Sequence, residues 1–388
     1  MDREKTGIAI TGIGLAVPEH RLEQQETAGR LAEALAGRPD AARWARRLFR
    51  QNGVETRYTC EPNLLAEPSA CRYFPSDGGA AAPAPGTAER MRIYKRESVP
   101  LALAAARAAL LESQAKPEQI THLITVSCTG QFLPGLDAEL CWQLGLASDV
   151  QRMPLQFLGC AAGLKAIGLA RQLAAGQPSA QVLIVCVELC TLHIQPSSER
   201  EALYSASFFG DGASACVVTA AARTGEADLF LLDEPYSTLL PGCADQMSWE
   251  LGDYGFELYL SPEVPKLIAR HIPDELERLL GGEMPSWWAV HPGGKGIVDS
   301  VQQTFGLADE LVANSRAVLR EYGNLSSATI LFVLHKQRQA LRESASPARD
   351  GLAVAFGPGL TFEMLRMTFA GADSVGKGHR EPERSIRA

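Results

Sequence analysis

The chain has 388 residues, of which 46% are hydrophobic and 21% charged, a balance typical of a globular protein with ample material for a core. Its net charge of −8 disfavours a nucleic-acid-binding surface, which needs clustered positive charge. No apolar stretch approaches the roughly 20 residues of a membrane span, and at this length we expect two domains or one duplicated unit.

Nine cysteines lie between Cys60 and Cys243 without a C-x-x-C pair, and no His or Cys group accompanies them at zinc-binding spacing. We therefore expect neither a disulfide scaffold nor a metal site. Reduced thiols are typical of a cytoplasmic protein, and most of these cysteines should be small buried residues.

Short β-branched runs alternate along the chain with longer segments of helical spacing, which favours an α/β architecture with mixed or mostly parallel sheets. We predict strands over 8–10, 122–127, 182–187, 215–218, 229–232, 287–290, 330–333 and 352–355. We predict helices over 31–51, 99–113, 138–144, 162–175, 263–280, 298–305 and 309–322.

Two segments break this alternation. Residues 61–90 are dominated by Pro, Ala, Gly and Ser, which predicts an exposed insertion. Residues 374–388 are charged and lack apolar periodicity, so we expect a loose tail.

Short motifs recur in the two halves of the chain. F-G-D-G at 209–212 has a counterpart in F-G-P-G at 356–359, and C-T-G at 128–130 follows a predicted strand as H-P-G-G at 291–294 does. This repetition predicts a duplicated α/β unit with halves over 1–222 and 223–373.

The segment F-L-G-C-A-A-G at 157–163 joins an apolar run to a predicted helix. Cys160 should therefore lie in a sharp turn at a helix N-terminus, where partial positive charge and free N–H groups favour a thiolate. A buried, inert cysteine in a tight turn fits the same pattern, and the local sequence leaves both interpretations open.

Two further polar residues lie in glycine-containing segments at junctions between predicted elements. His291 ends a predicted strand and begins a Pro-Gly-Gly turn, a position that commonly projects a side chain into a cleft. Asn324 follows a helix and a glycine, which by itself is typical of a helix C-cap. A nucleophile, an imidazole and a carboxamide at three such junctions together favour a catalytic site.

These motifs resemble those of the type III polyketide synthases, the chalcone and stilbene synthase-like members of the thiolase-fold superfamily, and the insertion at 61–90 resembles bacterial members. The similarity extends over residues 5–370 and rests on G-C-A-A-G at 159–163, F-G-D-G-A-S-A at 209–215, H-P-G-G at 291–294, G-N-L-S-S-A at 323–328 and F-G-P-G-L at 356–360. The resemblance implies a thiolase-like duplicated five-layer αβαβα fold. It also implies a homodimer in which L-P-G at 133–135 reaches across the interface.

The resemblance implies repeated decarboxylative condensation of malonyl-CoA onto an acyl-CoA starter, without a metal or redox cofactor. Cys160 would hold the acyl group as a thioester, and an imidazolium at His291 would lower the thiol pKa from its free value of about 8.5. His291 and Asn324 would stabilise the enolate, worth roughly 3–4 kcal/mol per donor. Phe209, a gatekeeper, would present an apolar face to the malonyl carboxylate, with Phe256 as the candidate second gatekeeper.

The resemblance also implies a substrate pocket lined by Cys128, Thr129, Leu133, His193, Ser326, Phe356, Gly357 and Pro358. Arginines 43, 46, 47, 50 and 57 form the densest cationic cluster, which fits either a phosphate-binding surface or a solvated helix face. We predict coenzyme A contacts at Arg47, Arg50, Lys295 and Gly296.

The resemblance to bacterial members implies a product of the pyrone, resorcinol or phloroglucinol type, often made from a fatty acyl starter. One alternative is a ketoacyl-carrier-protein synthase III-like enzyme, which condenses once. A remoter alternative is a non-catalytic acyl-binding protein of the thiolase fold.

Overall fold

The computed structural model describes residues 7–75, 82–221, 229–344 and 350–370. In this part of the chain nine strands form one mixed sheet in the order β11-β12-β13-β8-β1-β7-β6-β4-β5. Their bounds are β1 (Ile8–Ala16), β4 (His122–Ser127), β5 (Gln151–Gln156), β6 (Gln181–Leu189), β7 (Asp211–Ala220), β8 (Leu229–Leu239), β11 (Trp287–Val290), β12 (Asp350–Gly357) and β13 (Thr361–Ala370).

Strand pairing reveals an internal duplication. In the N-terminal half β4 and β6 are parallel, β7 is antiparallel to β6, and β1 lies beside β7. In the C-terminal half β11 and β12 are parallel, β13 is antiparallel to β12, and β8 lies beside β13. Only β5 lacks a counterpart among the described strands. The repetition that the motifs predicted is therefore a repetition of topology.

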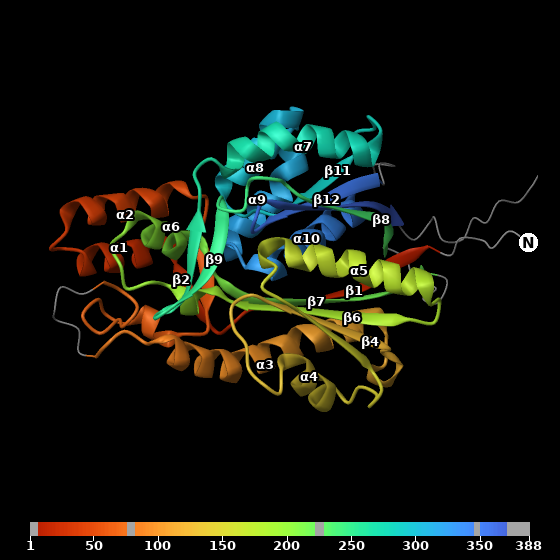
Figure 1. The fold of residues 1–388 in the computed structure, drawn as a ribbon, viewed down its shortest axis with the longest axis horizontal. Helices are drawn as coiled ribbons and strands as arrows, with labels where there is room; N and C mark the ends of the chain where they lie inside the picture. Colours follow the sequence, from red (N-terminus) through yellow and green to blue (C-terminus); the bar gives the residue numbers. More distant parts are fainter. Residues whose placement is uncertain (1–6, 76–81, 222–228, 345–349, 371–388) are drawn as a thin grey trace, which may run out of the picture.

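Helices separate and cover the two halves of the sheet, giving the five-layer thiolase-like arrangement seen in Figure 1. In the middle lie α5 (Ala162–Gly176) and α10 (Thr329–Glu343). One outer layer contains α3 (Thr87–Ser113) and α4 (Leu136–Leu144), and the other contains α7 (Val264–Leu280), α8 (Lys295–Phe305) and α9 (Asp309–Tyr322).

Side-chain alternation along β6 shows why the strands are apolar throughout. Val182, Ile184 and Cys186 pack in the core shared with α5 and α10, whereas Leu183 and Val185 pack against α3 and α4. Successive strand residues point to opposite faces, so a strand with helices on both sides needs apolar residues at every position.

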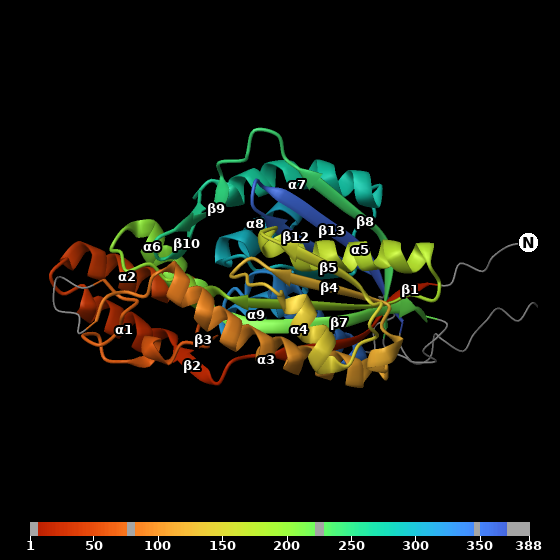
Figure 2. The same cartoon turned by 60° about the horizontal axis from the view of Figure 1, so that its bottom comes forward.

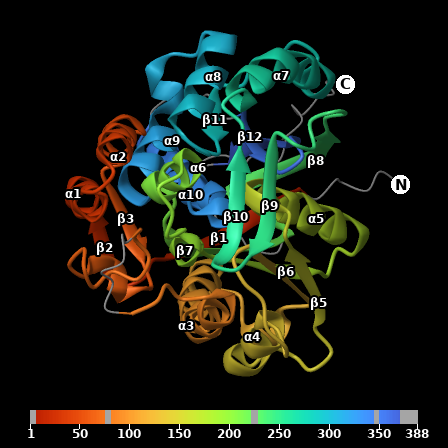
Figure 3. The ribbon, with the colours of Figure 1, turned by 60° about the vertical axis from the view of Figure 1, so that its left-hand side comes forward.

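Smaller elements gather at one end of the layers, as Figure 2 and Figure 3 show. They are α1 (Gln24–Ala34), α2 (Pro39–Gln51), α6 (Arg200–Phe208), the hairpin β2 (His20–Glu23)–β3 (Thr56–Thr59) and the hairpin β9 (Met247–Gly252)–β10 (Gly255–Leu260). The single helix predicted over 31–51 is wrong, because α1 ends at Ala34 and a new helix begins at Pro39. Proline suits this first helical position, where no N–H is needed.

The strand predicted over 330–333 is also wrong, because these residues lie in α10. Ile330, Leu331, Phe332 and Val333 are all buried, since α10 is enclosed between the two halves of the sheet. A short apolar run of this kind does not distinguish a buried strand from a buried helix.

Much of the segment predicted as an exposed insertion belongs to the folded body. Cys71, Tyr73 and Phe74 are buried against the cluster of α1 and α2, and Thr87 begins α3. Residues 76–81 and the predicted tail over 374–388 lie outside the described residues. None of the helices described is long and apolar enough to cross a bilayer.

Candidate active site

Cys160 lies in a single 3-10 turn (Gly159–Ala161) that leads directly into α5. Gly159 has a φ of +68°, and a Cβ there would lie 2.2 Å from the ring of Pro358. A Cβ on Gly163 would lie 2.2 Å from the carbonyl oxygen of Ser327. The two glycines therefore bring the nucleophile turn against two loops of the C-terminal half.

The structure brings Cys160, His291 and Asn324 together around one cavity of about 40 Å³, which Phe209 and Phe356 also line. More than 130 residues separate Cys160 from His291 in the chain. They meet because α5 begins and β11 ends at this point between the two halves.

Hydrogen bonds fix the orientation of the Asn324 carboxamide. Its Oδ1 accepts from the Ser326 N–H at 2.8 Å, so its NH2 group faces the other way. That group donates to the Gly293 carbonyl oxygen at 3.2 Å and lies 3.8 Å from Cys160 Sγ. Asn324 therefore presents a donor beside the sulfur.

His291 is fully buried, and its backbone N–H donates to the Val354 carbonyl at 2.8 Å. Neither ring nitrogen has a hydrogen-bond partner among the described residues. A buried polar group without a partner is costly, so this imidazole remains available to a ligand in the cavity.

The expected thiolate–imidazolium pair is not what burial favours. Burial raises the pKa of Cys160 to about 11, although Ser326 and Asn324 oppose that shift by hydrogen bonding. Burial lowers the pKa of His291 to about 3. Both groups are therefore neutral near pH 7, which corrects the low thiol pKa predicted from the helix N-terminus.

A second cavity of about 40 Å³ lies on the other side of the sulfur. It is lined by Cys160, Cys128, Ser326, Pro358, Phe157, Gly159, Phe209, Met247, Trp249 and Leu258. Cys128 Sγ lies 3.1 Å from Ser326 Oγ. Three of the predicted pocket residues, Cys128, Ser326 and Pro358, therefore lie around the Cys160 sulfur.

Thr129 does not line either cavity at the sulfur. Its hydroxyl donates to the fully buried Glu188 carboxylate at 2.7 Å and accepts from the Leu189 N–H at 2.9 Å. The Cys128 N–H and the Ser327 hydroxyl also donate to Glu188, whose pKa burial raises. Through these hydrogen bonds Thr129 and Glu188 hold the loop after β4 in place without lining the cavities at the sulfur.

The gatekeeper prediction needs one correction. Phe209 lines both cavities at the sulfur, whereas Phe256 lines neither of them. Phe256 and His193 instead line an adjoining cavity of about 340 Å³. Leu258, two residues further along β10 on the same face, borders both cavities at Cys160.

Two other predicted pocket residues lie elsewhere. Leu133 is 92% exposed and borders none of these cavities. Gly357 packs against the nucleophile turn, where an added Cβ would lie 3.0 Å from that of Ala161.

Three of the four predicted coenzyme A contacts lie together, and one lies elsewhere. Arg47, Lys295 and Gly296 line a cavity of about 290 Å³ together with Trp44, Asn52, Tyr204 and Asp299, whereas Arg50 is exposed outside it. Lys295 is paired with Asp299 at 2.6 Å.

Arg57, another member of the arginine cluster, is fully buried and cannot meet a phosphate at the surface. It donates to the carbonyls of Ala206 and Phe209, so it holds the gatekeeper backbone in place.

The sequence interpretation missed Trp249 and Met247 on β9 and Leu258 on β10. The alternation in W-E-L-G-D-Y-G-F-E-L-Y-L is a hairpin signal around two glycines. It does not say which face meets the site. Among the residues described, no group of three or more His, Cys, Asp or Glu side chains is placed to hold a metal ion.

The fold and the Cys–His–Asn arrangement define a condensing enzyme of the thiolase type. The models of the chalcone and stilbene synthases match both halves, the N-terminal domain over residues 2–222 and the C-terminal domain over 232–369. The chain belongs to this family, and it is a type III polyketide synthase that condenses acyl-CoA and malonyl-CoA.

Individual relatives cover most of the chain. This chain is 33% identical over 330 residues to type III polyketide synthase A of Arabidopsis thaliana, and the aligned region covers 82% of this chain and 81% of that protein. It is 31% identical over 398 residues to type III polyketide synthase pspB of Penicillium soppii, with 93% and 96% covered. The crystal structure of PKS-I from the brown alga Ectocarpus siliculosus matches with a TM-score of 0.85 at 27% identity, covering 95% of this chain and 100% of that one.

Proposed function

We propose that Cys160 carries the growing acyl chain and that His291 and Asn324 stabilise the enolate formed from malonyl-CoA. The observation behind this proposal is the single cavity that the three side chains share, in which the imidazole nitrogens have no other partner among the described residues.

In the loading step, the Cys160 thiol transfers its proton to neutral His291 as the sulfur attacks the starter carbonyl. The new thioester bond forms, the bond to the coenzyme A sulfur breaks, and the departing thiolate takes the proton from the imidazolium. Asn324 orients its NH2 group toward the reacting atoms.

In the extension step, malonyl-CoA loses carbon dioxide, and the electrons of the broken C–C bond move onto an enolate oxygen. His291 and Asn324 donate hydrogen bonds to that oxygen. The apolar ring of Phe209 disfavours the carboxylate relative to neutral carbon dioxide. The enolate carbon then attacks the carbonyl of the Cys160 thioester and the bond to the Cys160 sulfur breaks. The lengthened chain is left on coenzyme A, and the released Cys160 thiolate takes up a proton from solvent.

The mouth of the site is proposed to lie at the 290 Å³ cavity, where Arg47 and Lys295 supply positive charge for phosphate groups. The chain returns to Cys160 between extensions, and the released product is of the pyrone, resorcinol or phloroglucinol type. The two spaces of about 40 Å³ at the sulfur are small beside ordinary ligand pockets, so the starter should be short. We expect no metal or redox cofactor in this chemistry.

We also propose a cytoplasmic homodimer. Strand β5 ends the sheet order, and Leu133, Trp142, Phe157 and Leu158 are exposed apolar residues on or near it. An unpaired edge beside an apolar patch suits pairing with a second copy. The nine free cysteines fit a reducing compartment. Light scattering tests the dimer by comparing the molar mass of Leu158→Asp with that of the wild-type protein. A monomeric mass for both proteins would contradict the proposal.

The proposed function is tested by supplying malonyl-CoA with acyl-CoA starters of increasing length and no carrier protein. We expect intact-protein mass spectrometry to detect an acyl adduct that Cys160→Ala lacks, and product analysis to detect a polyketide extended by two or more units. Condensation only with malonyl carrier protein would favour the synthase III-like alternative. Reversible binding without an adduct would favour the acyl-binding alternative.

A further inference from the structure

Arg90, in the first turn of α3, is a fully buried cation that borders none of the cavities described above. Its Nε donates to the Pro85 carbonyl at 2.7 Å, and its Nη1 donates to the carbonyls of Leu192 and Ile194. The guanidinium lies 4.8 Å from the ring centre of Tyr73. Arg90 therefore forms hydrogen bonds with the backbone carbonyls on both sides of His193.

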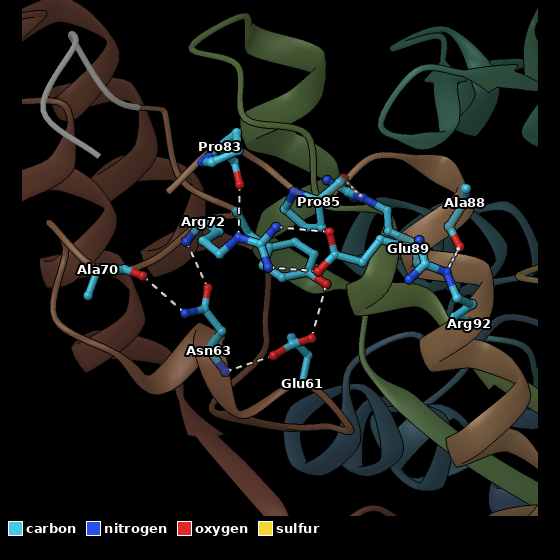
Figure 4. A network of polar contacts seen from close by, with 11 residues as sticks. Glu61, Asn63, Ala70, Arg72, Pro83, Pro85, Ala88, Glu89 and Arg92 are labelled. Carbon is cyan, nitrogen blue, oxygen red and sulfur yellow. Dashed lines mark hydrogen bonds and ion pairs between the residues drawn. The ribbon is translucent and has the colours of Figure 1, made fainter. Parts of the chain in front are cut away.

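The surroundings of Arg90 form a network of polar contacts. Figure 4 shows Arg72 facing Glu89, with Glu61 and Asn63 beside them. Arg72 pairs with Glu89 at 2.7 Å, and Tyr73 donates to Glu61 at 3.1 Å. A buried charge is costly unless its hydrogen bonds are satisfied, and Arg90 Nη2 has no partner among the described residues. The guanidinium is therefore held by its bonds to the three carbonyls and by the ring of Tyr73, which Glu61 fixes in turn.

The residue held between those carbonyls connects three elements. His193 Nε2 donates to the Thr129 carbonyl at 2.7 Å, and its Nδ1 accepts from the Phe256 N–H at 3.0 Å. Its ring stacks on that of Phe256 at 4.7 Å and meets Trp249 edge-on at 5.7 Å. The two hydrogen bonds set one tautomer, and a shift of residues 192–194 would move the β9–β10 hairpin.

A second contact joins the first turn of α3 to the same hairpin. The Thr87 N–H donates to the Asp253 carbonyl at 2.8 Å, and its hydroxyl donates to Gly252 and accepts from the Gly255 N–H. The start of α3 therefore holds both the turn of the hairpin and the segment against which the hairpin rests. That hairpin supplies Trp249 and Leu258 to the wall of the Cys160 cavity.

We propose that Arg90, assisted by Thr87, is a positioning residue that determines how closely Trp249 and Leu258 cover Cys160, and thereby the length of acyl chain that the enzyme accepts and releases. Arg90 touches no substrate in this proposal; it acts through residues 192–194 and the hairpin. The inference rests on the proposed role of Cys160 as acyl carrier. If that role is wrong, the unaltered enzyme will form no adduct; if this inference alone is wrong, adducts will form with an unaltered chain-length profile.

The test compares Arg90→Met with Arg92→Met. Arg92 is a matched control because it is an exposed arginine whose hydrogen bond within the described part of the chain goes to its own helix, at Ala88. The acyl adduct on Cys160 is measured with acetyl-, hexanoyl- and decanoyl-CoA, together with the product lengths and the melting temperature. We expect Arg90→Met to raise acylation by decanoyl-CoA relative to acetyl-CoA at least fivefold, with a changed KM ratio, while Arg92→Met leaves both ratios unchanged.

Arg90→Lys should restore part of the profile, because an ammonium still donates to the carbonyls of residues 192 and 194 without the planar contact to Tyr73. If Arg90→Met does not fold, Thr87→Val decides the matter, since it removes the hydroxyl bonds to the hairpin and keeps Arg90. A folded Arg90→Met or Thr87→Val enzyme with the unaltered chain-length ratio would overturn the inference. An equal shift in Arg92→Met would overturn it as well.

Discussion

The two halves of the fold place different chemistry at equivalent positions. Strand β4 is followed by Cys128 and its counterpart β11 by His291; the turn before α5 contains Cys160, and the turn before the equivalent α10 follows Asn324. A duplicated fold thus surrounds one reaction centre from two sides. In the proposed mechanism one half supplies the sulfur, and the other supplies the groups that donate hydrogen bonds to the enolate oxygen.

The equivalent residues also differ in what they contact. Cys128 Sγ already lies 3.1 Å from Ser326 Oγ, whereas the ring nitrogens of His291 have no partner among the described residues. Among the described residues that line the Cys160 cavity, the buried nitrogens without a partner are those of His291, in the C-terminal half. This difference predicts separate defects when each half is altered.

The largest effect is expected for Cys160→Ala in the N-terminal half. Without the sulfur no thioester can form, so polyketide synthesis should fall by about 10³-fold or more. Intact-protein mass spectrometry after incubation with acyl-CoA should show no adduct. Cys141→Ala, which alters another partly exposed thiol, is the control. An adduct of equal yield in Cys160→Ala would show that another residue is the nucleophile.

In the C-terminal half, Asn324→Ala should spare loading and impair extension. Loss of one enolate donor should lower malonyl-CoA decarboxylation by about 10²–10³-fold, measured as released carbon dioxide. The Cys160 adduct should still form. Cys128→Ser, at the position equivalent to His291, should change decarboxylation less than threefold. Equal losses in both variants would contradict the division between the halves.

Two kinds of site residue differ in how well the sequence could predict them. Some lie in glycine-containing motifs, and others lie on strands, where the face that meets the site is not encoded locally. Cys160, His291 and Asn324 could be proposed from the sequence because each lies in a short glycine-containing motif at the junction of two elements, and because the three motifs together resemble those of one family. The α/β class followed from the alternation of strands and helices, and the duplicated thiolase-like fold from the repeated motifs together with the family resemblance. Which of Phe256 and Leu258 meets the sulfur depends on where the hairpin rests, and that is decided by contacts distant in sequence.

Other errors have the same origin. Arg57 looked like its neighbours in the cationic cluster, but the carbonyls that bury it lie about 150 residues away. The α10 segment looked like a strand because its enclosure by two sheets leaves no polar face.

A third test concerns the wall between the small cavities and the larger one. Trp249 borders both the 40 Å³ space at Cys160 and the 340 Å³ cavity, and its indole N–H has no partner among the described residues. Trp249→Ala should join the two spaces and raise kcat/KM for a hexanoyl starter relative to acetyl by about tenfold. Tyr259→Ala alters the exposed opposite face of the same hairpin and should leave the ratio unchanged. A constant ratio in Trp249→Ala would mean that the wall lies elsewhere.

The smallest effect, and the finest test of the two halves, is the pH dependence of Cys160 alkylation. Because burial raises the thiol pKa to about 11 and leaves His291 neutral, the thiolate fraction should grow about tenfold per pH unit and reach no plateau below pH 9. The rate of iodoacetamide modification from pH 6 to 9, corrected with Cys160→Ala, measures this growth. His291→Gln should leave the slope unchanged, since a neutral ring adds no charge to the site. A plateau near neutrality that disappears in His291→Gln would instead mean that the two halves approach closely enough for the imidazolium to stabilise the thiolate before any substrate binds.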